Sequence, residues 1–148
     1  MAGAIVARRR AGWRQKLEIS AEDMVGSACS WIKGHNAQFT TMMALVHEQV
    51  DQGNPCVQEG DIALLARAKG FGWSEVREFK CDHNLWAVLT RYMVMLSPRL
   101  SKALCFRKSK VDEVDLQEKW YEIVPGQVRF MARDWQEAQK LCDTLGVR

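Results

Sequence analysis

The chain has 148 residues, of which 47% are hydrophobic and 26% charged, so its composition is that of one folded domain and excludes an intrinsically disordered chain. No apolar run approaches the roughly 18 residues that a membrane-spanning helix needs, and the N-terminus lacks the pattern of a secretory signal. These absences predict a soluble, cytoplasmic protein.

The formal net charge of +3 is unevenly distributed. A basic arm, residues 1–19, carries five basic side chains, and residues 99–110 carry five more without an acid. Residues 20–148 are predicted to form a single helical domain. If the fold brings the two basic segments together, they form a phosphate-binding face; otherwise they are separate solvated surfaces.

Two helices are predicted at the start of the domain. Ser20 and Asp23 have the spacing of a capping box, which predicts a helix that runs to about Lys33. A second helix is predicted over residues 36–52, because its apolar residues recur at steps of three and four and form one face. The glycine and proline of residues 53–55 end it.

The middle of the chain is also predicted to be helical. A helix over residues 61–69 is followed by two glycines, and another helix begins near Ser74. The next helix covers residues 84–96. Ser97 then provides a cap and Pro98 the first position of a short basic helix.

Residues 61–80, with the sequence DIALLARAKGFGWSEVREFK, have the positional pattern of two helices packed through a tight turn. The small residue at the helix contact is Ala66, and Gly70 follows it as the turn glycine. The apolar positions around the turn are Leu65, Phe71, Val76 and Phe79. The segment resembles a helix-turn-helix DNA-binding module, and the resemblance covers these residues only.

The resemblance implies a way of binding DNA. The helix that starts at Ser74 would lie in the major groove, where Arg77 and Lys80 meet bases or phosphates. The basic arm would follow a minor groove or the backbone, and residues 99–110 would add phosphate contacts. The predicted nucleic-acid-binding residues are Arg8, Arg9, Arg10, Arg14, Ser74, Arg77, Lys80, Arg99, Lys102, Arg107, Lys108 and Lys110.

The segment also departs from the module. Lys69 precedes the turn glycine, where an apolar residue is usual, and Gly72 and Trp73 enlarge the turn. The second helix carries Glu75 and Glu78, whose carboxylates repel phosphate. Because the same spacing occurs in ordinary helical hairpins, both interpretations stay open.

The C-terminal part is predicted to contain a helix, a β-hairpin and a closing helix. Apolar spacing predicts the helix over residues 111–122, and alternation around a proline–glycine pair predicts the hairpin over residues 121–131. Asp134 caps the closing helix. The acidic residues expected to form a solvated face are Asp112, Glu113, Asp115 and Glu118. The expected fold class is mainly α: a compact multi-helix domain with a helix-turn-helix-like pair, a small C-terminal β-hairpin and a closing helix.

No catalytic or metal site is predicted. Residues 47–51, HEQVD, half-resemble the zinc-protease pattern HExxH, with Asp51 in place of the second histidine, but no third ligand has a suitable spacing. The five cysteines form no CxxC pair, so we expect free and mostly buried thiols. The tryptophans are expected to pack in the core rather than to stack on bases. We therefore expect no metal, no cofactor and no enzymatic activity.

The sequence predicts a non-enzymatic nucleic-acid-binding accessory or regulatory protein. The alternative is a protein-interaction module, such as an adaptor, inhibitor or assembly subunit, whose basic arm docks on an acidic protein surface. One positive face joining the arm, Arg77 and residues 99–110 favours the first function, and patches on opposite sides favour the second. The sequence leaves the oligomeric state open.

Overall fold

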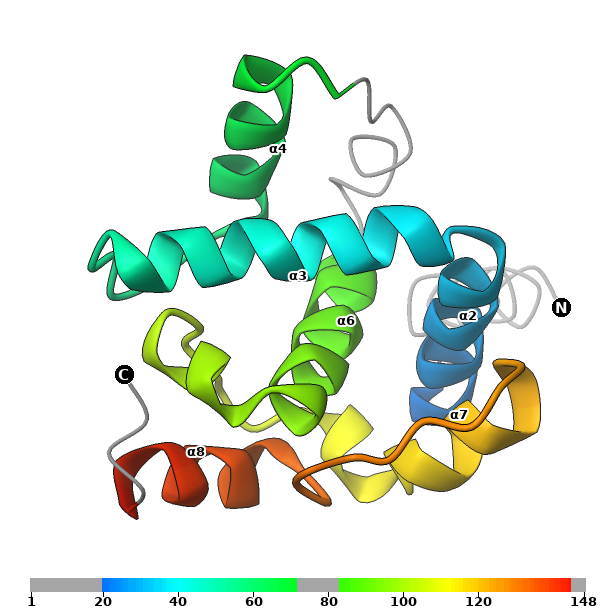
Figure 1. Cartoon of the computed structure of the whole chain (residues 1–148). Helices are drawn as coiled ribbons and strands as arrows, with labels where there is room; N and C mark the ends of the chain where they lie inside the picture. Colours follow the sequence, from blue (N-terminus) through cyan, green and yellow to red (C-terminus); the bar gives the residue numbers. More distant parts are fainter. Residues whose placement is uncertain (1–19, 72–82, 145–148) are drawn as a thin grey trace, which may run out of the picture.

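Helix α6, His83–Leu96, occupies the centre of the structure (Figure 1). The computed structural model describes residues 20–71 and 83–144. Every side chain from residue 88 to residue 95 is buried. A helix that is almost entirely apolar around its circumference is stable only when other elements cover all its sides, and this requirement places α6 in the core.

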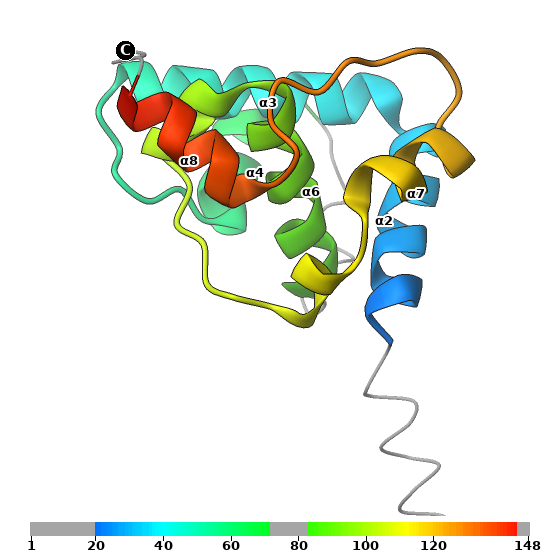
Figure 2. The same ribbon diagram turned by 90° about the horizontal axis from the view of Figure 1, so that it is seen from below.

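The other helices cover α6 from several directions. Helix α2, Ala21–Gly34, contacts α6 on one side and also holds α7, Leu116–Ile123. On another side, the 3₁₀ helix η2, Pro98–Lys102, and α8, Trp135–Thr144, contact α6 and each other. Helix α3, Asn36–Asp51, crosses this group and contacts η2 (Figures 1 and 2).

Helix α4, Glu59–Ala68, packs on α3 and ends as the sequence predicts. Gly70 has a φ of 85°, in the left-handed region that favours glycine. Its N–H donates to the carbonyl of Arg67 at 2.9 Å, and the N–H of Phe71 donates to that of Ala66 at 2.9 Å. This pair of bonds is the Schellman motif, which satisfies carbonyls that the helix end leaves unpaired.

The predicted boundaries of several helices are confirmed. Ser20 Oγ accepts from the N–H of Asp23 at 3.1 Å, so the serine caps α2. Asp134 caps α8 in the same way, accepting from the N–H of Glu137 at 2.8 Å. Pro98 stands in the first turn of η2, but Ser97 makes no side-chain cap bond, because its hydroxyl contacts a histidine of α3 instead. The helix predicted from Ser74 lies outside the described residues.

The predicted β-hairpin over residues 121–131 is wrong, because the described residues contain no β-strand. The first three of them continue α7, and the remainder form an irregular connection. The N–H groups of Met131 and Ala132 both donate to the carbonyl of Met95, at 2.9 and 3.1 Å, at the end of α6. Partly buried apolar side chains of this alternating segment pack on the core without forming a sheet, since Phe130 packs against Tyr92 and Trp120.

The helix predicted over residues 111–122 is divided into two elements. The 3₁₀ helix η3, Lys110–Glu113, is followed by α7 after a break at Val114, whose ψ of 140° is extended. The division follows from capping, because Asp115 accepts from the N–H of Glu118 at 3.1 Å and starts a new helix.

The tryptophan prediction is confirmed for the described positions. Trp31 and Trp120 are buried, and Trp86 and Trp135 pack partly buried against the same core. Core residues come from both ends of the described chain, from Met24 to Ala138, and form one cluster. Among the described helices, none combines the length and the apolar character needed to cross a membrane.

Candidate functional site

The predicted nucleic-acid-binding residues divide into two groups. Those of the basic arm and of the second helix of the helix-turn-helix-like segment lie outside the described residues, and they are Arg8, Arg9, Arg10, Arg14, Ser74, Arg77 and Lys80. The remaining five belong to residues 99–110, and the structure gives each of them a position.

Arg99 is held against α3. It is only partly exposed, forms an ion pair with Asp51, and its Nη1 lies 2.8 Å from His47 Nδ1. These contacts attach η2 to α3. Arg99 therefore has a structural role that the sequence did not indicate.

The other four basic side chains of this segment are exposed, namely Lys102, Arg107, Lys108 and Lys110. Lys102 lies on η2 beside α8, whereas Arg107 and Lys108 belong to the connection between η2 and η3. Arg107 and Lys108 border a cavity, which brings them together with residues of α6.

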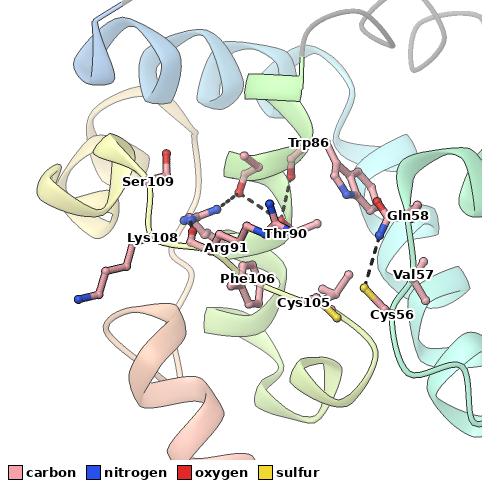
Figure 3. A pocket seen from close by; sticks show the side chains of 13 residues that line it. Cys56, Val57, Gln58, Trp86, Thr90, Arg91, Cys105, Phe106, Lys108 and Ser109 are labelled. Carbon is pink, nitrogen blue, oxygen red and sulfur yellow. Dashed lines mark hydrogen bonds between the residues drawn. The ribbon is translucent and has the colours of Figure 1, made fainter.

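We call this cavity the groove. It has a volume of about 530 Å³ and lies between α6, the connection before α4 and the connection after η2 (Figure 3). Three of the described residues that line it are cationic and none is a carboxylate. Its lining residues are Cys56, Val57, Gln58, Trp86, Ala87, Thr90, Arg91, Leu104, Cys105, Phe106, Arg107, Lys108 and Ser109.

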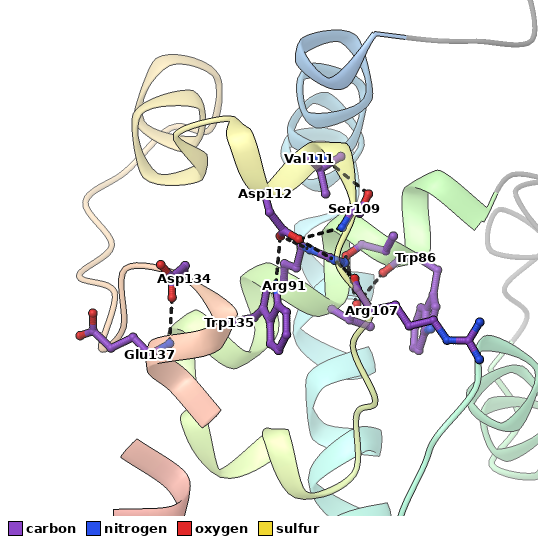
Figure 4. Close-up of polar contacts among 11 residues, drawn as sticks. Trp86, Arg91, Arg107, Ser109, Val111, Asp112, Asp134, Trp135 and Glu137 are labelled. Atoms are coloured by element: carbon purple, nitrogen blue, oxygen red, sulfur yellow. Dashed lines mark hydrogen bonds and ion pairs between the residues drawn. The ribbon is translucent and has the colours of Figure 1, made fainter. Parts of the chain in front are cut away.

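Arg91, at the inner wall of the groove, is only 3% exposed and is bonded on several sides (Figure 4). Its guanidinium donates from Nε to Asp112 Oδ1 at 2.7 Å, from Nη1 to the carbonyl of Ala87 at 2.9 Å, and from Nη2 to that of Arg107 at 2.8 Å. Asp112 neutralises this buried charge. The positive charge available to a ligand therefore comes from Arg107 and Lys108 at the rim.

Asp112 connects three parts of the chain. It accepts from the Trp135 indole at 3.0 Å and from the N–H of Ser109 at 3.0 Å, in addition to Arg91. Although burial alone would raise its pKa, the hydrogen bonds from Arg91 and Ser109 and the positive charge of Arg91 lower it. The prediction that Asp112 belongs to a solvated acidic face is wrong.

Phe106 anchors the connection that carries the two rim cations. Its ring stacks on Trp135 with centroids 5.1 Å apart, and the Arg91 guanidinium lies 5.4 Å from its centre. Arg107 and Lys108 are the next two residues, so this aromatic contact fixes their backbone beside the groove. Trp86 of α6 is half-buried on the lining and presents a second aromatic surface there.

No protein-family model matches this sequence, and no curated protein or solved structure shows significant similarity to it.

His47 and Ser97 form a pair that is unsuited to nucleophilic catalysis. Ser97 Oγ lies 3.3 Å from His47 Nε2, while the Arg99 guanidinium, which can only donate, contacts Nδ1. Nδ1 must therefore be the acceptor, and in the neutral ring the proton is on Nε2. That nitrogen donates to the serine and cannot accept its proton. Among the described residues, no group of three His, Cys, Asp or Glu side chains is arranged to hold a metal ion.

Stability is expected to fall as the pH drops below 6.5, through His47. Burial, followed by the charge of Arg99, lowers the pKa of His47 from 6.5, and Asp51 only partly opposes this effect. The unfolded chain then takes up a proton that the folded chain resists, so the free energy of unfolding is highest above pH 6.5 and decreases towards the lower, folded pKa. Urea denaturation at pH 8 and pH 5 measures the decrease.

His47→Asn is the test variant, because its amide oxygen can still accept from Arg99 while it cannot titrate. The difference in stability between the two pH values should become smaller in this variant. Gln38→Asn, a change on the same helix that removes no titratable group, serves as the control and should keep the wild-type difference. An unchanged difference in His47→Asn would exclude His47 as its source.

Some groove residues were not predicted from the sequence. Arg91 and Trp86 lie within an apolar helix, where the pattern indicates only burial. A buried arginine requires hydrogen-bond acceptors. The presence of Arg91 in an apolar helix was therefore the sequence signal that a carboxylate, such as that of Asp112, had to lie nearby.

Proposed function

We propose that the protein is a non-enzymatic nucleic-acid-binding accessory or regulatory protein. The observation that carries the proposal is the groove, whose lining includes Arg107 and Lys108 but no carboxylate among the described residues. Cationic side chains attract phosphates, and each phosphate that they neutralise releases counterions, which favours binding.

The position of the groove supports the proposal. Gln58, one of its lining residues, is also the N-cap of α4, the first helix of the segment that resembles a helix-turn-helix. The groove therefore adjoins the start of that segment. Arg107 and Lys108 would contact the phosphate backbone, while the residues proposed from the resemblance, Arg77 and Lys80, would contact bases or phosphates.

The test is the salt dependence of DNA binding by the full chain. Fluorescence anisotropy with a labelled duplex should show an affinity that falls steeply as salt rises, because each neutralised phosphate releases counterions. The double variant Arg107→Ala/Lys108→Ala should bind more weakly, and its plot of log K against log salt should be less steep, with a slope smaller in magnitude by about 2.

The matched control removes two exposed cations that do not line the groove, Lys33→Ala/Arg129→Ala. It changes the net charge equally and should reduce the slope by far less. Absence of binding at low salt, or equal losses in both double variants, would overturn the proposal. Single-stranded DNA and RNA as competitors then identify the preferred nucleic acid.

The alternative function, a protein-interaction module, is favoured by a different surface. Tyr121 and Met131 are large apolar residues that are 50% and 63% exposed, and the ring of Phe130, the residue before Met131, lies 5.9 Å from that of Tyr121. Aromatic and methionine side chains are enriched in protein interfaces. A protein partner that survives nuclease treatment and is lost in Tyr121→Ala/Met131→Ala would support this function.

A further inference from the structure

Two cysteines from distant parts of the sequence meet in the groove. Cys56 precedes α4 and Cys105 follows η2, and the two thiols are close enough to interact electrostatically. The two sulfurs lie side by side in Figure 3. The exposed Cys105 and the half-buried Cys56 both line the groove, so a small molecule that enters it reaches both thiols.

The neighbouring backbone holds the two thiols in position. The N–H of Val57 donates to the carbonyl of Ala103 at 2.6 Å, which joins the two connections directly beside the cysteines. The Cys105 thiol also donates to the carbonyl of Pro55 at 3.6 Å. A disulfide needs two cysteines whose backbones are already close, and these contacts bring the two connections together.

We propose that Cys56 and Cys105 form a reversible disulfide by exchange with a low-molecular-weight disulfide. The pair is thus a site of oxidative modification at the groove. The bond would join the connection before α4 to the connection after η2, across the residues that lie next to Arg107 and Lys108.

The exchange proceeds in two steps. The Cys56 thiolate attacks one sulfur of the small disulfide, whose sulfur–sulfur bond breaks and releases a first thiolate. The Cys105 thiolate then attacks the Cys56 sulfur of the mixed disulfide and releases a second one. The two released thiolates take up the two protons that the cysteines lost. The cysteine pair is oxidised by two electrons, and the small disulfide is reduced to two thiols.

The local contacts set the order of attack. Gln58 Nε2 donates to Cys56 Sγ at 3.4 Å and positions this sulfur at the groove. The neighbouring Cys56 thiol, together with burial, raises the pKa of Cys105 to about 11. Cys56 is therefore the attacking residue and Cys105 the resolving one. Of the remaining described cysteines, Cys29 and Cys142 are buried and out of reach of such a reagent.

Peptide mapping of the full chain tests the proposal. The native protein is treated with glutathione disulfide, blocked with iodoacetamide, unfolded and digested with trypsin, which cuts after Lys33, Arg67, Lys102 and Arg107. Residues 34–67 and 103–107 then form separate peptides with one cysteine each. We expect these peptides as one disulfide-linked species, which dithiothreitol separates.

Two variants complete the experiment. Cys105→Ser should stop at a glutathione adduct on Cys56, since the resolving thiol is missing. Cys142→Ser removes a cysteine outside the groove and should still give the linked peptides. If the wild-type protein yields glutathione adducts only, or links Cys56 or Cys105 to a different cysteine, the proposed pair is overturned.

Discussion

Replacing Asp112 by alanine is expected to destabilise the fold by about 3 kcal/mol, the low end of the range for breaking a buried ion pair. The cost arises because Arg91, which is 3% exposed, would remain as a buried cation without its carboxylate. The value lies at the low end because the carbonyls of Ala87 and Arg107 still accept from the guanidinium. The Trp135 indole and the N–H of Ser109 would lose their acceptor as well.

Urea denaturation of the wild type and Asp112→Ala measures this loss. Asp51→Ala is the matched control, because Asp51 pairs with Arg99 at a side chain that is 64% exposed, and exposed pairs contribute roughly 0–1 kcal/mol. Since the pKa of Asp112 is lowered from 3.8, its contribution is present above that pH and is lost as the pH falls below it. A cost of Asp112→Ala no larger than that of the control would contradict this role.

Replacing Trp120 by alanine is expected to cost about 3–5 kcal/mol, as is usual for a large aromatic residue in a core. Trp120 is 3% exposed and its ring contacts three others. Its centroid lies 4.9 Å from that of Tyr92, 5.4 Å from that of Phe130 and 6.1 Å from that of Phe39. The substitution leaves a cavity where α7, α6 and α3 meet.

The control Trp120→Phe separates packing from polarity. The indole N–H of Trp120 has no hydrogen-bond partner among the residues that the structure describes, so phenylalanine removes an unsatisfied buried donor while it keeps an aromatic ring. It should therefore cost clearly less than alanine, as measured by thermal and urea unfolding. Equal losses in the two variants would show that ring contacts with Tyr92, Phe130 and Phe39 are not what Trp120 contributes.

Local sequence signals predicted most helix boundaries correctly. Ser20 and Asp134 cap the helices that were assigned to them, and Gly70 ends α4 in the left-handed conformation. These features depend on residues within about one turn of each other, so a short window of sequence contains the information that determines them.

The predicted hairpin failed because alternation describes exposure and not hydrogen-bond partners. Val128 and Phe130 are partly buried at a step of two, as in a strand. The backbone after them bonds to the carbonyl of Met95 at the end of α6, which the residues of the connection do not reveal. Which partner a backbone N–H finds is a property of the packed chain.

The candidate site likewise combines features that are visible in the sequence with contacts that depend on the fold. Charge and periodicity are local properties, so the sequence predicted the helices and the cluster of basic residues that contains Arg107 and Lys108. The attachment of Arg99 to α3 and the neutralisation of Arg91 by Asp112 depend on the packed fold. The packed fold also brings Cys56 close to Cys105, 49 positions later in the chain. Each of these contacts joins residues more than twenty positions apart, and such pairings are set by how the helices cover α6 and bury its apolar surface.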